Sequence, residues 1–96
     1  MKISLSPQRR DDTLVVSKAG DVLTINGVEF DFSVVPDGAT LPAPAVNCPF
    51  IGGPVERVGG DLQLTLILPL AADASEAARF PQPIINPADG ALELPQ

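Results

Sequence analysis

Apolar and polar residues alternate along residues 13–32, and the alternation breaks at Asn26-Gly27. Both residues of this pair tolerate a positive φ, so they suit the two-residue type I′ turn that matches the twist of paired strands. The turn also sets the register of the two strands, with Ile25 opposite Val28 and Leu23 opposite Phe30. The residues expected on one face are Leu23, Ile25, Val28, Phe30 and Phe32, and those on the other are Thr24, Glu29 and Asp31. Residues 13–32 are therefore predicted to form a three-stranded meander.

The first turn of this meander has two interpretations. A two-residue loop at Ala19-Gly20 keeps Leu14 and Val16 on the core face, although it gives an alanine an unfavourable φ. A three-residue loop with Gly20 left-handed is sterically easier, and it brings Val15 inward instead. We favour the first interpretation because it aligns Leu14 and Val16 with the apolar face of the following hairpin.

A second hairpin is predicted within residues 54–70. Two runs, 55–58 and 61–68, flank Gly59-Gly60, which is a strong hairpin signal. In the second run, four leucines alternate with other residues, namely Leu62, Leu64, Leu66 and Leu68. The opposite face becomes apolar towards Ile67. We expect this strand to be central in its sheet, or covered on both sides at its far end.

Proline-rich segments connect and follow the hairpins. Residues 36–49 are expected to cross between them in an extended, polyproline-like conformation. Asp73, with alanines and an acidic residue three positions on, predicts one or two helical turns with Asp73 at the N-cap. The proline-rich C-terminal segment 81–96 has room only for short edge strands, at residues 84–85 and 91–94.

The 11 prolines and 8 glycines interrupt the chain at short intervals and exclude long helices. The runs between them are rich in Val, Ile, Leu, Thr and Phe, which is typical of strands. With a further strand at residues 3–5, the sequence predicts one all-β domain spanning residues 1–96. Its expected form is a small antiparallel sandwich or partly open barrel of about six or seven short strands with at most one short helix.

Charge narrows the range of partners. The chain has 6 Lys+Arg against 12 Asp+Glu, which gives a net charge of −6. Affinity for nucleic acid comes mainly from lysine and arginine, and the one basic pair, Arg9-Arg10, is followed by Asp11-Asp12, so we expect no nucleic-acid partner. No apolar run approaches the ~20 residues of a membrane span, and no signal-peptide-like stretch follows Met1. We therefore expect a soluble protein made in the cytoplasm, with no membrane partner.

The residue types also restrict the chemistry. Histidine is absent, which excludes Ser-His-Asp and Cys-His catalysis and imidazole metal sites. Cys48 is interpreted as a small apolar group, because no histidine can activate its thiol. Asp11-Asp12 is interpreted as a solvated turn rather than a cation site, since a calcium loop needs further oxygens at set spacing. Glu29 and Asp31 read as a polar strand face rather than an acid-base pair. We expect no enzyme activity, no catalytic residue, no cofactor and no metal.

Several stretches of the chain carry a resemblance to a known family, namely residues 6–14, 16–27, 30–33, 38–42, 53–57 and 62–66. They resemble a family of small proteins encoded in tailed bacteriophages and prophages, and the resemblance extends to about residues 80–83. Family members often carry an aromatic segment before the Gly-Pro-Val-Glu-Arg block, where this chain has Asn47, Cys48, Pro49, Phe50, Ile51 and Gly52. The resemblance implies a gene in the tail or tail-fibre part of the phage module. It implies no residue roles, because no activity or catalytic residues are established for the family.

This resemblance and the missing catalytic chemistry predict a function by contact. We expect a non-enzymatic accessory or assembly component of the phage tail module that acts through protein-protein contact. Its expected location is the cytoplasm of the bacterial host, with association to the virion as a second location. The alternative function is a small acidic inhibitor or decoy of a host protein, because a net charge of −6 can engage a basic surface.

The expectation of self-association rests on one predicted strand. Residues 64–70 are strongly apolar and uncharged, which is typical of a strand that pairs with another chain if its edge is open. We predict a homo-oligomer, a dimer, whose interface residues are Leu64, Leu66, Ile67, Leu68 and Leu70. Burial of the same strand in the core of a monomer is the competing interpretation.

Overall fold

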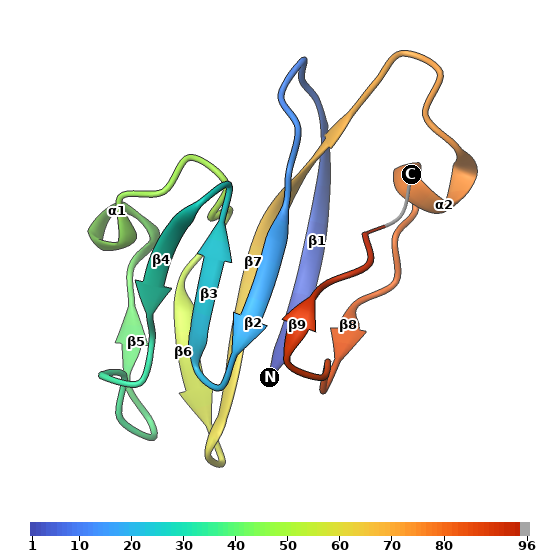
Figure 1. Ribbon diagram of the computed structural model, residues 1–96. Coiled ribbons are helices and arrows are strands. Elements are labelled where there is room, and N and C mark those ends of the chain that lie inside the picture. Colours follow the sequence, from blue (N-terminus) through green and yellow to red (C-terminus); the bar gives the residue numbers. More distant parts are fainter. Residues whose placement is uncertain (95–96) are drawn as a thin grey trace.

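The computed structural model describes residues 1–94, which form two β-sheets packed face to face (Figure 1). The larger sheet runs from edge to edge through β5 (Thr40–Leu41), β6 (Val55–Val58), β7 (Asp61–Leu70), β1 (Lys2–Arg9) and β8 (Ile84–Ile85). The smaller sheet runs through β4 (Val28–Asp31), β3 (Val22–Ile25), β2 (Val16–Ala19) and β9 (Gly90–Ala91). The predicted all-β class is confirmed. The described residues form nine strands where about six or seven were expected, and two short helices where at most one was expected.

The register of the hairpin β3-β4 matches the prediction. Ile25 pairs with Val28 and Leu23 pairs with Phe30. Asn26 has a φ of 49° and Gly27 a φ of 83°, as a type I′ turn requires. One residue of the expected apolar face differs in its surroundings, because Val28 next to the turn is 56% exposed.

The turn between β2 and β3 is displaced by one residue from the favoured prediction. Ala19 pairs with Val22, so the two-residue loop consists of Gly20 and Asp21 and not of Ala19 and Gly20. Gly20 then takes the positive φ of 60° at the first loop position, where type II′ turns place glycine. With this loop, Ala19 stays in the strand and does not need a positive φ. The predicted facing is retained, since Val16 is buried and Val15 is exposed.

The second hairpin is also confirmed. Val58 pairs with Asp61 across Gly59 and Gly60, whose φ angles are 59° and 81°. The strand β7 lies between β6 and β1, so it is central as expected. Its four alternating leucines are all buried, namely Leu62, Leu64, Leu66 and Leu68.

The pairing of β1 with β7 departs from the antiparallel expectation, because these two strands are parallel over eight residues. The N–H of Arg10 donates to the carbonyl of Leu70 at 3.2 Å, which places the nitrogens of even-numbered residues of β1 towards β7. Pro7 therefore has its nitrogen on the outer side, where its missing N–H removes no bond to β7. This explains how β1 continues through a proline and well beyond the expected residues 3–5.

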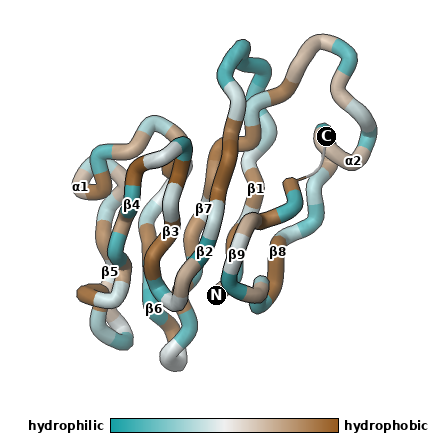
Figure 2. Tube along the Cα trace, in the orientation of Figure 1, coloured by the Kyte–Doolittle hydropathy of each residue, from teal (hydrophilic) through white to brown (hydrophobic). Residues whose placement is uncertain are grey.

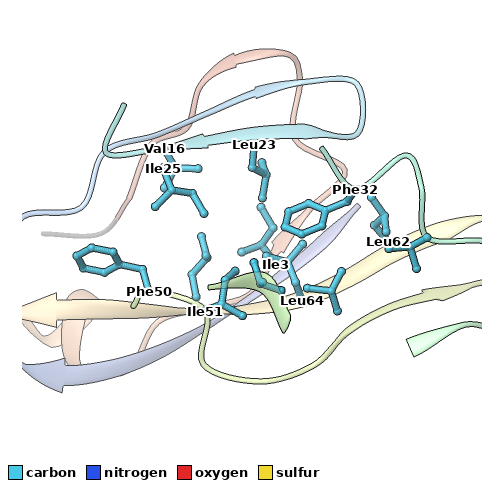
Figure 3. Packing of buried hydrophobic residues seen from close by; sticks show 13 residues of the cluster. Ile3, Val16, Leu23, Ile25, Phe32, Phe50, Ile51, Leu62 and Leu64 are labelled. Atoms are coloured by element: carbon cyan, nitrogen blue, oxygen red, sulfur yellow. The ribbon is translucent and has the colours of Figure 1, made fainter. Parts of the chain in front are cut away.

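The core lies between the two sheets (Figure 3). Val16, Leu23 and Ile25 of the smaller sheet face Ile3 and Leu64 of the larger one. Phe32, Phe50 and Ile51 from the connecting segments pack into the same layer. No polar or charged residue among those described is buried. Hydrophobic burial is thus the main stabilising contribution in this interior.

The crossing segment contains a helical turn where an extended conformation was expected. The helix α1 (Ala43–Val46) has Pro42 at its N-cap and Pro44 in its first turn. Its C-cap is Asn47, which has a φ of 56°. A proline in the first turn of a helix loses no hydrogen bond, and asparagine tolerates the left-handed conformation at a helix end. The second helix α2 (Glu76–Arg79) is capped by Ser75, so the expectation of Asp73 at the N-cap is wrong.

The C-terminal segment forms two short edge strands, as expected, and the structure places one in each sheet. The strand β8 pairs with Lys2 and Ile3 of β1, and β9 pairs with Ser17 and Lys18 of β2. The second edge strand begins at Gly90 and is shorter than the predicted 91–94. The last two residues of the predicted segment 81–96 lie outside the described residues.

Candidate functional site

The structure separates the five residues of the expected interface. Leu64, Leu66 and Leu68 are at most 3% exposed, so a folded chain cannot present them to a second copy. One edge of β7 is paired with β1 along residues 63–70, and the other is paired with β6 at residues 61–63 and with residues 50–52 at residues 65–67. The interface therefore stays a prediction only at Ile67 and Leu70, which are half-buried.

The segment before β6 covers β7 at Ile67. The N–H of Ile67 donates to the carbonyl of Phe50 at 2.8 Å, and the N–H of Gly52 donates to the carbonyl of Thr65 at 2.9 Å. A Cβ at Gly52 would lie 3.2 Å from Cγ1 of Ile67. Ile67 is therefore packed against this segment, and Leu70 is the other half-buried residue of the expected interface.

Leu70 lines a groove of about 720 Å³ at the end of β7. We call it the β7-end groove. Its walls are the connection between β1 and β2, the residues that follow β7, the helix α2, and Leu94. Its apolar lining comprises Leu14, Leu68, Pro69, Leu70, Ala71, Ala74, Ala78 and Leu94, and its polar lining comprises Arg10, Asp11, Asp12, Thr13, Asp73 and Ser75.

The helix α2 forms its wall because a local cap starts it there. The Oγ of Ser75 accepts a hydrogen bond from the N–H of Ala78 at 3.2 Å, and the Ser75 carbonyl accepts from the N–H of Arg79 at 3.0 Å. Ala78 is 2% exposed, and its small side chain lets the turn approach β7 closely. Leu68 and Ala78 are buried outside the main core cluster, so they form a separate apolar floor.

The hydrophilic connection that follows β1 forms the opposite wall, at the top of Figure 2. Within it, Arg10 is held by three groups. Its guanidinium lies 2.7 Å from the carboxylate of Asp12, donates to the carbonyl of Pro49 at 3.3 Å, and stands 5.0 Å from the centre of the Phe50 ring. Residues 47–52 thus supply two of the contacts of Arg10.

The rim of the β7-end groove carries a negative charge. Arg10 is the one basic residue among its described lining residues, against Asp11, Asp12 and Asp73, so the local charge is 1 − 3 = −2. Asp12 is engaged with Arg10. Within residues 1–94, Asp11 and Asp73 have no hydrogen bond or ion pair to another residue. The groove can therefore hold an apolar side chain and attract a cation beside it.

The other residues considered from the sequence lie apart from the groove or in ordinary surroundings. Cys48 is a half-buried free thiol beside α1. Glu29 and Asp31 are exposed on the edge strand β4. Hydrogen bonds from the hydroxyl and the N–H of Ser33 lower the pKa of Asp31. Among the described residues, no group of three or more Cys, Asp or Glu side chains is placed to hold a metal ion.

Sequence reasoning missed the hydrogen bonds of Arg57, which lies on β6. Its side chain is 14% exposed and donates to three carbonyls and one carboxylate. The acceptors are the carbonyls of Val35 at 2.6 Å, Phe32 at 3.2 Å and Gly60 at 3.2 Å, and Oδ2 of Asp21 at 3.0 Å. The available signal was an arginine two positions after Val55, and therefore on the same face of the strand as that buried valine. The arrangement joins the two sheets and is a structural site.

Comparison with known proteins gives no match. No model of a known protein family matches the chain, and neither do the curated proteins nor the solved structures that were searched. In the part of the chain that the structure describes, no helix is both long enough and apolar enough to span a membrane. Proposals about function therefore rest on the β7-end groove, on the charge of the chain and on the resemblance of its sequence stretches.

Proposed function

We propose that this protein is a non-enzymatic accessory or assembly component of a phage or prophage tail module, and that it acts by binding another protein. The observation that carries the proposal of contact is the β7-end groove, a hollow with an apolar floor and a charged rim on a small β-domain. Surfaces of this kind, with an apolar centre and a polar surround, are typical of protein-binding sites. The tail context is supported by the resemblance of the separate sequence stretches named above, between residue 6 and about residues 80–83, to phage-encoded proteins.

Deletion of the gene from the phage or prophage tests this function. We expect fewer infectious particles, and electron microscopy should show incomplete or misassembled tails. The purified protein should also be retained by tail proteins. Normal tails in the deletion strain, together with no retention, would overturn the proposal. Mass spectrometry of purified particles distinguishes a protein that stays in the virion from one that remains in the host cytoplasm.

A second candidate, an acidic inhibitor or decoy of a host protein, is supported by the charge. The chain carries a net charge of −6, and Asp11 and Asp73 lie unpaired beside the groove among the described residues. An acidic surface steers a basic partner towards it. In this case the deletion strain should make intact particles that propagate poorly in a particular host. Particle morphology therefore separates the two candidates.

A further inference from the structure

We propose that the β7-end groove binds a partner protein through a segment with an apolar side chain flanked by lysine or arginine. This inference rests on the proposed function, because it names the chemistry of the partner that the protein contacts. The segment would insert its apolar side chain between α2 and the connection that follows β1. Its basic side chains would meet the acidic rim.

The apolar half of this recognition follows from the apolar residues that line the groove. Leu14, Leu70 and Leu94 are half-buried there, so part of each side chain faces solvent in the free protein. Covering this surface with an apolar group removes it from water, which favours binding. The volume of about 720 Å³ lies within the range of about 300–1,000 Å³ that is usual for binding pockets. An apolar side chain and its neighbours can thus enter without rearrangement of the floor.

The basic half follows from the rim. Asp11 and Asp73 have no partner among residues 1–94, whereas the charge of Arg10 is already engaged by Asp12 and the Phe50 ring. A cation brought beside the apolar floor therefore gains unpaired carboxylates and meets no free positive charge among the described lining residues. The net charge of −6 draws basic partners from a distance as well.

The same rim disfavours a second copy of this chain as the occupant. In a two-fold contact the same patch meets itself, so Asp11 and Asp73 would approach their own copies. Like charges brought together across an interface oppose association. A different protein with a basic segment satisfies both the floor and the rim.

Peptide binding followed by NMR tests the proposal on the full chain. The probe is an acetylated and amidated peptide, Lys-Arg-Leu-Phe-Lys-Arg. Two control peptides replace either its four basic residues by glutamate or its Leu-Phe by Ser-Ser. We expect the probe to give saturable amide shifts at Leu14, Leu70, Ala71, Ala74 and Ala78. Each control peptide should bind at least about fivefold more weakly, because one half of the recognition is missing.

Matched variants separate the groove from general acidity. Asp73→Lys and Glu56→Lys both change the net charge from −6 to −4, but Glu56 lies opposite Gln63, at the other end of β7. Strands rise about 3.3 Å per residue, so this site is on the order of 20 Å from Leu70. Screening at ~0.15 M salt acts over about 8 Å. We expect about fivefold weaker probe binding for Asp73→Lys and less than about twofold for Glu56→Lys.

A second pair of variants tests the apolar contact. Leu70→Ser removes an apolar side chain from the groove, and Val58→Ser is its control, since Val58 is 52% exposed and lies beside the other end of β7. Only Leu70→Ser should weaken the binding of the probe peptide. If Leu70→Ser does not fold, the comparison of Asp73→Lys with Glu56→Lys still tests the proposal. No saturable shifts, shifts spread over the acidic surface, or equal losses for Asp73→Lys and Glu56→Lys would overturn the proposal. Groove shifts that grow with protein concentration without peptide would identify a second copy as occupant and would also overturn it.

The outcome can be told apart from that of the proposed function. If gene deletion impairs tails while phage carrying Asp73→Lys and Leu70→Ser assemble normally, the groove proposal fails and the tail function stands. If deletion leaves tails and propagation normal while the probe binds as expected, the tail function fails and the groove proposal stands.

Discussion

Nη2 of Arg57 lies 3.0 Å from Oδ2 of Asp21, and this ion pair joins β6 of the larger sheet to the β2-β3 turn of the smaller one. The same nitrogen donates to the carbonyl of Phe32, and Nε donates to the carbonyl of Val35. One side chain thereby fixes the turn, the end of β4 and the β6 strand relative to each other. The planar fork of arginine suits such divergent acceptors, which the single ammonium group of lysine cannot match.

Replacement of Arg57 should destabilise the fold. Arg57→Ala leaves the carbonyls of Val35 and Phe32 without their donor in a partly buried position, and we expect a loss of about 2–4 kcal/mol in the free energy of unfolding. Arg57→Lys should recover only part of this loss. Urea denaturation measures both. Arg9→Ala, at an exposed residue of β1, is the control and should change stability by less than about 0.5 kcal/mol. Equal effects of the two alanine variants would contradict this role.

Asn26 should contribute more than its turn conformation. Its Oδ1 accepts from the N–H of Val15 at 2.7 Å, and its Nδ2 donates to the carbonyl of Thr13 at 2.8 Å. Asn26→Gly keeps the positive φ available but removes both bonds, so we expect a loss of about 1–2 kcal/mol. Asn47 has a similar φ of 56°. Within residues 1–94 its side chain makes no hydrogen bond, so Asn47→Gly should be close to neutral in the same urea experiment.

Stability should fall at acidic pH through Asp89, which lies before β9. The hydrogen bond from Lys18 and that from the N–H of Gly20 lower the pKa of the Asp89 carboxyl. A carboxyl with a lowered pKa stabilises the fold above its unfolded pKa of about 3.9, and the contribution is lost as pH falls through the folded pKa. Asp89→Asn should therefore be less stable than the wild type above pH ~4, with a difference that shrinks below it.

Urea denaturation between pH ~2 and ~6 measures this difference. Asp73→Asn makes the same charge change at a residue that has no partner within residues 1–94. Its stability should follow that of the wild type across the range. A constant difference between Asp89→Asn and the wild type at every pH would rule out the contribution of this carboxylate.

Two adjacent glycines should respond differently to alanine. A Cβ at Gly52 would lie 3.2 Å from Cγ1 of Ile67, whereas a Cβ at Gly53 would meet nothing closer than 3.9 Å. Alanine reduces the conformational entropy of the unfolded chain, so Gly53→Ala should stabilise by about 0.4–1 kcal/mol. Gly52→Ala should lose that gain because Ile67 must shift, and we expect it to be about 1 kcal/mol less stable than Gly53→Ala. Thermal and urea unfolding measure the pair, and a more stable Gly52→Ala would show that Ile67 moves freely.

Both hairpins could be predicted because their information is local. Asn26-Gly27 and Gly59-Gly60 each occupy a two-residue turn with positive φ at both positions. Such a turn sets the pairing of the adjoining strands without help from the rest of the chain. The β2-β3 turn was displaced by one residue because two loops of the same parity satisfy the hydrophobic pattern. The left-handed preference of Gly20 selects between them.

The candidate site could not be predicted in the same way. Leu70 was expected at an interface for its apolar character, but the hollow beside it is built from α2, the connection after β1 and Leu94. The unpaired state of Asp73 likewise depends on which charges the fold brings near it. Alternation along one strand carries no information about such neighbours.

The all-β class and the inward face of the four leucines of β7 could be derived from the order of residues alone, because alternation and turn chemistry act between near neighbours in the chain. Three features emerge only from the folded chain, namely the parallel direction of β1 beside β7, the link that Arg57 makes between the two sheets, and the groove with an acidic rim beyond Leu70. The direction of a distant strand and the partners of a charge depend on how both sheets pack over one shared core.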